Sequence, residues 1–273
     1  MRIGVLGCAG RMGRAVLAEV LAADDLVLAG GVEPAGHPAI GQDLGSLAGT
    51  DPVGLVAQRD APALIRAADV VIEFSTPAAT LGHAESAAAV GIPHVIGTTG
   101  LSSAEAAALR AAAQAIPVVW AANMSLGINL LQGLVEQAAR ALPADVFDIE
   151  VVEMHHRHKV DAPSGTALAL GRAAAAGRAV DLDAVAERGR DGLTGARVSG
   201  RIGFAALRGG DVVGDHTVIF AGAGERLELT HRATDRRIYA RGAVQAARWV
   251  PGRPPGLYGM RDVLGLGSPG ELV

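Results

Sequence analysis

Potentially cationic side chains are concentrated in one short segment, residues 155–159, whose sequence is His-His-Arg-His-Lys. The sequence Pro-Ser-Gly-Thr follows at residues 163–166, and Pro and Ser are suited to the first turn of a helix. The N–H groups of Gly165 and Thr166 would then be able to hold a carboxylate. An imidazole, whose unperturbed pKa is about 6.5, is suited to proton transfer near neutral pH. The segment therefore predicts a receptor for a small polyanion with proton transfer, as a reductase of a carboxylated substrate requires.

Two other interpretations of this segment stand beside that one. His155, His156 and His158 could bind a metal ion, but no cysteine is available, and the adjacent Arg157 and Lys159 would oppose a divalent cation. A solvated basic loop is the second alternative, although clustered histidines beside a helix N-terminus are an unusual way to form an idle surface. We therefore expect an anion site and no metal.

A glycine-rich turn near the N-terminus points to a dinucleotide. Gly7, Gly10 and Gly13 are spaced Gly-x-x-Gly-x-x-Gly between the first expected strand and the first expected helix. Glycines there let the backbone approach a pyrophosphate and aim helix N–H groups at its charge. Glu33 ends the second expected strand, 20 residues after Gly13, where an acidic side chain can accept hydrogen bonds from the adenosine ribose. A plain structural turn and a solvated glutamate are the alternatives, but the placement of both motifs favours the cofactor.

Residues near this turn bear on the choice between NADH and NADPH. Residue 34 is Pro, which has no guanidinium to meet a 2′-phosphate, so we expect NADH to bind at least as well as NADPH. Arg11 and Arg14 keep NADPH possible, since an arginine beside the loop could still meet the phosphate.

Short apolar runs alternate with helical stretches through the first part of the chain, which is the pattern of a parallel sheet covered by crossover helices. Strands are expected at residues 1–6, 26–32, 52–57, 69–74, 94–97 and 118–122. Helices are expected at residues 11–22, 61–67, 77–90 and 102–114. The pattern predicts an α/β, Rossmann-like nucleotide domain.

The pattern changes after Asn123. Helices are expected at residues 127–142, 165–177 and 236–249, and a strand at 146–155. Successive antiparallel strands joined by glycine turns are expected at residues 202–207, 212–221 and 226–232. A polar, glycine-rich stretch at 187–200 precedes them, and a loop of that length is more often functional or interfacial than idle.

The composition limits the classes of partner. The chain has 273 residues, half of them hydrophobic, which is enough for two domains. A formal net charge of −4 and an aromatic content of 3% disfavour nucleic-acid binding. The apolar runs are too short or too interrupted for a signal peptide or a membrane span. Cys8 is the only cysteine, so no intrachain disulfide can form, and we expect a cytoplasmic protein without nucleic-acid or membrane partners.

The sequence also resembles a known family. Residues 155–166 resemble the signature of 4-hydroxy-tetrahydrodipicolinate reductases, and residues 7–14, 97–100, 121–125 and 260–264 resemble further family segments in the expected order. The resemblance covers essentially the whole chain, and the histidine-lysine segment is its most specific part. It implies NAD(P)H-dependent reduction of a small cyclic dicarboxylate on the pathway to diaminopimelate and lysine.

The resemblance further implies a domain organisation. Residues 1–125 and 236–273 would form the dinucleotide-binding domain. Residues 126–235 would form an α+β domain with a mixed sheet that binds substrate and assembles a homotetramer. The strands after Ile202 would supply the tetramer face.

Roles for individual residues follow from the same resemblance. His155 is implied as acid/base and Lys159 as proton donor, while His156, Gly165 and Thr166 would hold the substrate. The dinucleotide would be held by Gly7, Cys8, Ala9, Gly10, Arg11, Met12, Glu33, Gly97, Thr98, Thr99, Ala121, Ala122, Asn123 and Met124.

Two positions depart from the family's pattern in ways that bear on the site. Met124 stands where Phe is frequent, a change that a flexible side chain tolerates, and Glu73 stands where Asp is common. Two rival functions also remain. Another two-domain nicotinamide dehydrogenase, of the aspartate or homoserine type, would share the glycine loop but not the histidine-lysine segment. A non-catalytic dinucleotide sensor would use His155 and Lys159 only to hold an anion.

Overall fold

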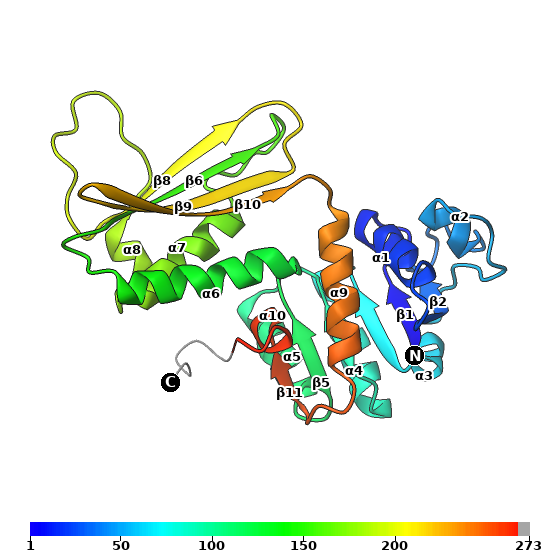
Figure 1. Cartoon of the computed structure of the whole chain (residues 1–273). Coiled ribbons are helices and arrows are strands. Elements are labelled where there is room, and N and C mark those ends of the chain that lie inside the picture. Colours follow the sequence, from blue (N-terminus) through cyan, green and yellow to red (C-terminus); the bar gives the residue numbers. More distant parts are fainter. Residues whose placement is uncertain (267–273) are drawn as a thin grey trace. The chain divides into compact units, whose positions relative to one another are not determined.

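The computed structural model describes residues 1–266, which form two compact units (Figure 1). The first unit combines Met1–Leu126 with the chain from Arg237 onward, and the second is Gly127–Arg236. Residues 267–273, which the sequence analysis assigned to the nucleotide domain, lie outside the described residues. Each unit has its own sheet and its own buried core.

The first unit is built on a six-stranded sheet in the order β11-β5-β4-β3-β1-β2, and every pair in it is parallel. The chain moves from β1 to β2 in one direction and from β1 to β3 in the other, so the strand order reverses at β1. This reversal is typical of dinucleotide-binding sheets, and the predicted Rossmann-like class is confirmed. The strands are β1 (Arg2–Leu6), β2 (Val27–Val32), β3 (Val70–Glu73), β4 (His94–Ile96), β5 (Pro117–Trp120) and β11 (Gly256–Tyr258).

Helices cover both faces of this sheet and form two separate apolar cores. They are α1 (Arg11–Leu21), α2 (Leu44–Ala48), α3 (Ala61–Ala67), α4 (Pro77–Val90), α5 (Ser103–Ala112), α9 (Arg237–Trp249) and α10 (Met260–Val263). Helix α4 has the predicted bounds because Thr76 caps its first turn, Pro77 begins it and Gly91 ends it. Ser102 and Glu105 form a capping box at the start of α5.

The strand expected at residues 52–57 does not form, and this prediction was wrong. Gly54 adopts a φ of +75°, and Val56 makes only a single bridge, to Asp43. The Asp43 carboxylate accepts hydrogen bonds from the N–H groups of both Val53 and Gly54, so the backbone folds around a side chain instead of pairing with a strand. Strand β11 was also missed, because a three-residue strand in a Pro/Gly-rich tail shows no periodicity.

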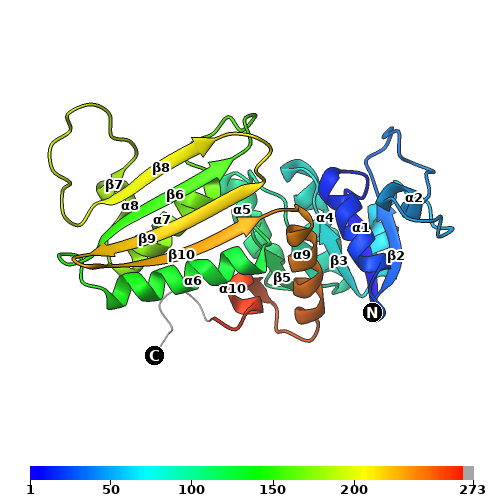
Figure 2. The same cartoon turned by 45° about the horizontal axis from the view of Figure 1, so that its top comes forward.

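The second unit contains a five-stranded mixed sheet in the order β10-β9-β6-β8-β7, which confirms the predicted mixed architecture. The central strand β6 runs parallel to β8 and antiparallel to β9. The strands are β6 (Asp148–His155), β7 (Ala186–Glu187), β8 (Ile202–Arg208), β9 (Gly214–Gly222) and β10 (Glu225–Ala233). Helices α6 (Leu126–Ala141), α7 (Gly165–Gly177) and α8 (Leu182–Val185) complete the unit, and α6 and α7 cover one face of the sheet (Figure 2).

Strands β8 and β9 are not neighbours, although the sequence predicted successive antiparallel strands. Strand β6 lies between them, and residues 209–213 cross its end. Because β6 lies between them, β8 and β9 are two strand spacings apart, about 10 Å, which the five residues 209–213 can span. The crossing chain is tied to β6 by hydrogen bonds from Gly209 N–H to His155 O (3.0 Å) and from His156 N–H to Val212 O (2.7 Å). The topology therefore places a second backbone segment beside the predicted catalytic histidine.

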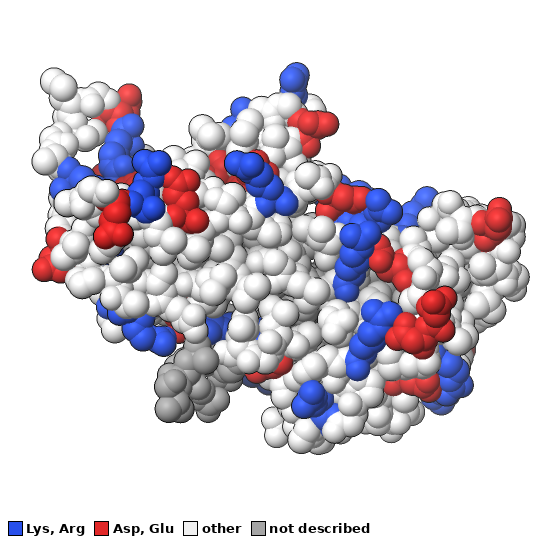
Figure 3. Space-filling view, in the orientation of Figure 1, with Lys and Arg blue, Asp and Glu red and all other residues white. Residues whose placement is uncertain are grey.

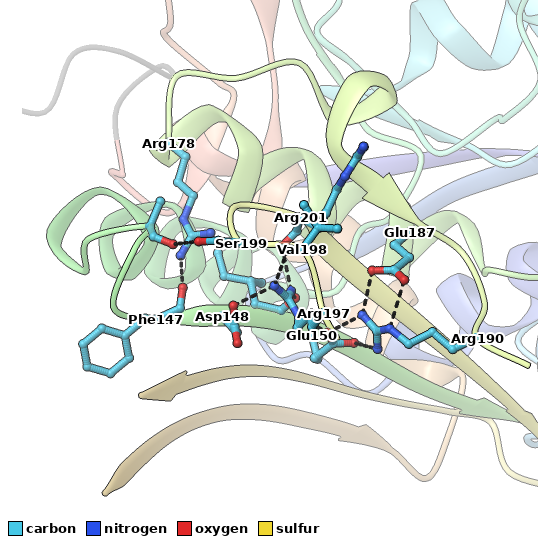
Figure 4. Close-up of polar contacts among 12 residues, drawn as sticks. Phe147, Asp148, Glu150, Arg178, Glu187, Arg190, Arg197, Val198, Ser199 and Arg201 are labelled. Carbon is cyan, nitrogen blue, oxygen red and sulfur yellow. Dashed lines mark hydrogen bonds and ion pairs between the residues drawn. The ribbon is translucent and has the colours of Figure 1, made fainter. Parts of the chain in front are cut away.

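The long polar loop before β8 is anchored to β6 by arginines (Figure 4). Arg197 binds Asp148 (2.6 Å) and Glu150 (2.9 Å), and Arg190 binds Glu150 (2.8 Å) and Glu187 (2.9 Å). Because these pairs are partly exposed, each contributes modestly to stability, and their main effect is to fix the ends of the loop.

Basic and acidic side chains are interspersed on the face seen in Figure 3, with no continuous basic stripe across it. Within residues 1–266, no helix combines the length and apolar character that a membrane span needs.

Candidate active site

The residues predicted to bind the dinucleotide gather at one edge of the first sheet. Gly7 follows β1, Glu33 follows β2, Gly97 follows β4 and Ala121 follows β5. Because the strands are parallel, their carboxyl ends share one edge, and open α/β sheets bind ligands at such an edge where the strand order reverses. The structure thus brings together four segments that are far apart in the sequence.

The glycine loop is packed too tightly for side chains at two of its three glycines. Gly7 has a φ of +78°, and a Cβ there would lie 2.3 Å from Phe74 O. A Cβ on Gly13 would lie 2.0 Å from Gly7 O, so α1 begins in direct contact with the loop. A Cβ on Gly10 would instead meet Gly7 O at 3.4 Å, an ordinary contact. The protein itself does not exclude a side chain at Gly10, and a glycine there fits the close approach of a ligand.

Several N–H groups of the loop are used within the protein. Gly7 and Cys8 both donate to Val32 O, at 3.0 and 3.3 Å, and Ala9 donates to Glu33 Oε1 at 2.6 Å. One oxygen of the buried Glu33 is therefore committed to shaping the loop, whereas the prediction assigned this side chain to the ribose alone. The Cys8 side chain is fully buried, and burial raises the pKa of its thiol to about 12. Cys8 can therefore approach a cofactor only through its backbone.

The start of α1 offers the N–H groups best suited to a pyrophosphate. Arg11 and Met12 are its first two residues, so their N–H groups have no acceptor within the helix. Gly10 is the N-cap and supplies no side-chain cap to them. Arg14 Nε donates to Ala9 O at 2.8 Å, and both Arg11 and Arg14 are exposed.

The turns after β4 and β5 are held by internal hydrogen bonds. Thr98 is buried, its Oγ1 accepts from Ser75 N–H (3.1 Å), and its carbonyl accepts from Trp120 Nε1 (3.2 Å). Met124 is buried in the core, and its carbonyl packs so closely on Gly242 that a Cβ there would lie 1.7 Å away. The side chains of Thr98 and Met124 therefore stabilise the fold. A ligand at these positions would be contacted by backbone groups.

In the second unit, His155 forms a tight pair with Glu153 at the end of β6. His155 Nδ1 lies 2.6 Å from Glu153 Oε2, and both residues are buried. Burial opposes ionisation of Glu153, but hydrogen bonds from Arg208, His155 and the Ser164 N–H outweigh it and hold the pKa of this carboxyl below its ordinary value. The carboxylate is ionised at neutral pH and accepts the Nδ1 proton, which leaves Nε2 of His155 as the atom able to exchange a proton.

Arg208 connects this pair to the loop that carries Lys159. Its guanidinium binds both oxygens of Glu153, at 2.8 and 2.9 Å, and also donates to Asp161 O at 2.5 Å. The side chain of Asp161 in turn binds Lys159 Nζ at 2.8 Å. The two predicted catalytic groups, His155 and Lys159, are thus positioned through one arginine.

His216 on β9 completes the surroundings of His155. The two rings meet edge to face with their centroids 5.0 Å apart. Ser164 Oγ accepts from Ala167 N–H as the cap of α7 and is also hydrogen-bonded to His216 Nε2, at 3.1 Å. Burial lowers the pKa of His216 to about 4, so the ring is neutral at neutral pH and places no full charge beside His155.

The predicted anion-binding residues lie on the segment that follows His155. Gly165 and Thr166 are the first two residues of α7, where backbone N–H groups point out of the helix end. His156 Nε2 lies 3.5 Å from Arg236 Nη2, and burial, followed by the charge of Arg236, lowers the pKa of His156. Within residues 1–266, no group of three or more His, Cys, Asp or Glu side chains is arranged to hold a metal ion.

Sequence reasoning missed four residues of this site: Glu153, Arg208, Gly214 and His216. A signal existed for Glu153, which lies two positions before His155 and therefore on the same face of a strand. The others become neighbours of His155 only through strand pairing, and a Cβ on Gly214 would lie 3.0 Å from His155 Nε2.

A parallel sheet with a glycine loop, together with a separate mixed-sheet unit that carries a carboxylate-bound histidine, defines a two-domain oxidoreductase of the nicotinamide-dependent type. Comparison with known families is more specific. The model described as the N-terminus of dihydrodipicolinate reductase matches residues 1–124, and the model for its C-terminus matches residues 127–264. The chain belongs to the dihydrodipicolinate reductase family, and the resemblance stated from the sequence is confirmed.

Relatives agree with this assignment over almost their whole length. The chain is 58% identical to the 4-hydroxy-tetrahydrodipicolinate reductase of Parvibaculum lavamentivorans, covering 97% of this chain and 98% of the relative. It is 55% identical to that of Afipia carboxidovorans, with 98% of each chain covered. A solved dihydrodipicolinate reductase from Paenisporosarcina sp. TG-14, with dipicolinate bound, superposes with a TM-score of 0.76 at 25% identity and covers 96% of this chain and 98% of that one.

Proposed function

We propose that the protein reduces 4-hydroxy-tetrahydrodipicolinate, by way of dihydrodipicolinate, to tetrahydrodipicolinate with NADH or NADPH, on the pathway to diaminopimelate and lysine. The structural observation that carries this proposal is the Glu153–His155 pair beside the N-terminus of α7, in a chain of this family. The names of the relatives supply the substrate. Aspartate and homoserine dehydrogenases are disfavoured by the family match, and a sensor has no need of a carboxylate-fixed histidine.

The first unit would hold the dinucleotide, and its residues fit that role. Gly7 and Gly13 give the loop its close-packed shape, Arg11 and Met12 present N–H groups to the pyrophosphate, and Glu33 lies where a ribose hydroxyl would bind. The bound nicotinamide supplies the hydride. The backbones of residues 97–99 and 121–124 would lie along its ribose and ring.

The second unit would bind the substrate and move protons. Loss of water from the hydroxylated ring gives a conjugated imine, and hydride addition to it leaves electron density on a neighbouring carbon, which must then be protonated. Nε2 of His155 is the group suited to this exchange, since Nδ1 is held by Glu153. Gly214 leaves space beside Nε2, because any side chain there would crowd it.

Lys159 would act as the proton donor, and His156, Gly165 and Thr166 would bind the substrate carboxylates. In the structure the Lys159 ammonium is paired with the exposed Asp161, so delivery of its proton would require this pair to open. Surface pairs of this kind are weak enough to be exchanged for a substrate carboxylate.

Cofactor preference and assembly are further parts of the proposal. Pro34 after Glu33 supports binding of NADH at least as strong as that of NADPH. Arg11 and Arg14 are both exposed beside the loop and are the arginines that could meet a 2′-phosphate. The largely exposed strand β10 supports a homotetramer formed through the mixed sheet. A cytoplasmic location rests on the sequence prediction.

A direct test mixes purified protein with NADH or NADPH and freshly generated 4-hydroxy-tetrahydrodipicolinate and follows the loss of nicotinamide absorbance. We expect oxidation of both nucleotides, with NADH at least as fast. A folded protein that binds nucleotide but does not oxidise it in the presence of substrate would overturn the proposal and favour the sensor.

A further inference from the structure

A buried ionic cluster lies beneath the carboxyl edge of the first sheet, outside the groups assigned to the reaction. Its centre is Glu73, the last residue of β3, whose side chain is fully buried. Oε1 accepts hydrogen bonds from His83 Nδ1 at 2.8 Å, from Thr80 Oγ1 at 3.1 Å and from the Ser75 hydroxyl. One carboxylate thus joins β3, the turn that follows it and helix α4.

The second oxygen of this carboxylate meets another buried histidine. Glu73 Oε2 lies 2.8 Å from His94 Nε2 on β4, and the His94 side chain has no exposed surface. The two atoms are in contact, although their alignment is not that of a hydrogen bond. Burial opposes ionisation of Glu73, but the contacts with His83 and His94 outweigh it and hold the pKa of the carboxyl well below its ordinary value.

The turn that Glu73 holds separates two segments of the proposed dinucleotide site. Phe74 O lies against Gly7, where a Cβ would be 2.3 Å away, and the Phe74 ring lies against Gly97, where a Cβ would be 2.1 Å from Cε1. Ser75 N–H donates to Thr98 Oγ1 at 3.1 Å. The residues that touch Glu73 or follow it therefore set the spacing between the glycine loop and the turn after β4.

We propose that Glu73 is a positioning residue for the dinucleotide, whose buried charge holds the Phe74–Ser75 turn as a spacer between Gly7 and the Gly97–Thr98 turn. The proposal rests on the dinucleotide site proposed above. A well-packed apolar side chain would fill the volume of Glu73 at a lower desolvation cost than a buried carboxylate. If only the charge of Glu73 is removed, its hydrogen-bonding partners stay buried without it. Removing the charge of Glu73 should therefore let the turn relax and should weaken nucleotide binding more than it alters proton transfer.

The test uses Glu73→Gln, which keeps the shape and removes the charge, with NADH binding followed by nicotinamide fluorescence. We expect the dissociation constant of NADH to rise roughly tenfold, the KM for NADH to rise with it, and kcat to change little. Glu73→Asp, which keeps the charge, should recover part of the affinity.

Glu136→Gln is the matched control. Glu136 is a buried glutamate of the second unit, with an ion pair to Arg140 at 2.7 Å, and its substitution should lower thermal stability without changing NADH affinity. Should Glu73→Gln fail to fold, Thr80→Val removes a single hydroxyl from the cluster and should weaken NADH binding by a smaller factor.

The outcomes separate this inference from the proposed function. Wild-type protein that binds neither NADH nor NADPH would overturn the dinucleotide site and the role of Glu73 together. A different result would separate the two proposals. If the wild type binds NADH, and Glu73→Gln and Thr80→Val bind it equally well, the proposed function stands and the role of Glu73 is overturned. The same holds if Glu73→Gln and Glu136→Gln differ only in melting temperature.

Discussion

The two proposed sites, the dinucleotide site of the first unit and the His155 site of the second, are built by opposite means. In the first unit, the glycine loop depends on side chains that are missing, since a Cβ on Gly7 or Gly13 would overlap neighbouring backbone. In the second unit, His155 depends on side chains that are present, with Glu153 on its own strand and Arg208 on the next. The glycine loop is partly encoded by local spacing, because Gly13 packs on Gly7, whereas Arg208 and His216 reach the surroundings of His155 only through strand pairing.

This difference has consequences for substitution. Changes in the first unit should act through shape and affect nucleotide affinity. Changes around His155 should act through proton transfer and leave nucleotide affinity unchanged, because the residues concerned belong to a separate unit with its own core. Substitutions in each unit can therefore test whether the two sites respond separately.

Replacement of His155 by Ala should have the largest effect on turnover. A positioned acid or base contributes roughly 10²–10⁴ in rate, so kcat should fall by that factor while the dissociation constant of NADH stays the same. Steady-state kinetics and nucleotide titration of the same sample measure both. The exposed His158 provides the control, because His158→Ala should keep wild-type kcat. Loss of NADH binding in His155→Ala would show that changes at the His155 site also affect the dinucleotide site, and would contradict the proposed separation.

Gly13→Ala should have the opposite effect to His155→Ala: it should weaken NADH binding by distorting the glycine loop. The added methyl would lie 2.0 Å from Gly7 O, and overpacking of this kind costs about 1–3 kcal/mol, which corresponds to roughly 5–150-fold in NADH affinity if it falls on the binding conformation. Gly10→Ala adds the same methyl at 3.4 Å from the same oxygen, so it should keep the melting temperature of the wild type. Equal melting temperatures for both variants would contradict the packing argument.

Arg208→Lys tests whether Arg208, which binds Glu153, positions His155. A lysine keeps the charge but cannot bind both oxygens of Glu153, so we expect kcat to fall roughly tenfold with NADH affinity unchanged. Arg226→Lys, at an exposed pair with Glu228 on β10, is the control and should be silent. Unchanged turnover in Arg208→Lys would restrict Arg208 to a structural role.

His216 should make stability depend on pH. Its folded-state pKa is lowered from 6.5 to about 4, so between these values the unfolded chain binds a proton that the folded protein does not. The contribution of His216 to the free energy of unfolding should therefore fall by roughly 3 kcal/mol as the pH falls from 6.5 to 4. Urea unfolding at pH 7 and pH 4.5 should show a smaller loss for His216→Gln than for wild type, whereas His158→Gln should behave as wild type does.

The sequence predicted elements best where local chemistry marks their ends. Helix α4 begins and ends as expected because Thr76, Pro77 and Gly91 mark its two ends. Helix α7 likewise begins directly after its cap, Ser164. The strand expected at residues 52–57 failed because the side chain of Asp43 captures the backbone there, a contact about ten residues away in the sequence that periodicity does not show.

The candidate site shows the same limit at longer range. The histidine-lysine segment and the glycine loop were visible as residue types at close spacing, and they pointed to the family directly. Arg208 and His216 were not visible. Arg208 reaches Glu153 only when β8 lies parallel to β6, and His216 reaches the His155 ring only when β9 lies antiparallel on the other side.

The sequence alone was enough to predict a dinucleotide loop, an anion-binding helix start and a histidine for proton transfer, because each prediction rests on a few consecutive residues. Only the tertiary structure shows that Glu153 holds Nδ1 of His155 and that the N–H groups of Gly7, Cys8 and Ala9 already donate within the protein. The loop N–H groups donate to Val32 and Glu33, which lie at the end of another strand, and Arg208 on β8 fixes the Glu153 carboxylate that holds His155. A donor or acceptor is available only when no neighbour in the fold has already taken it.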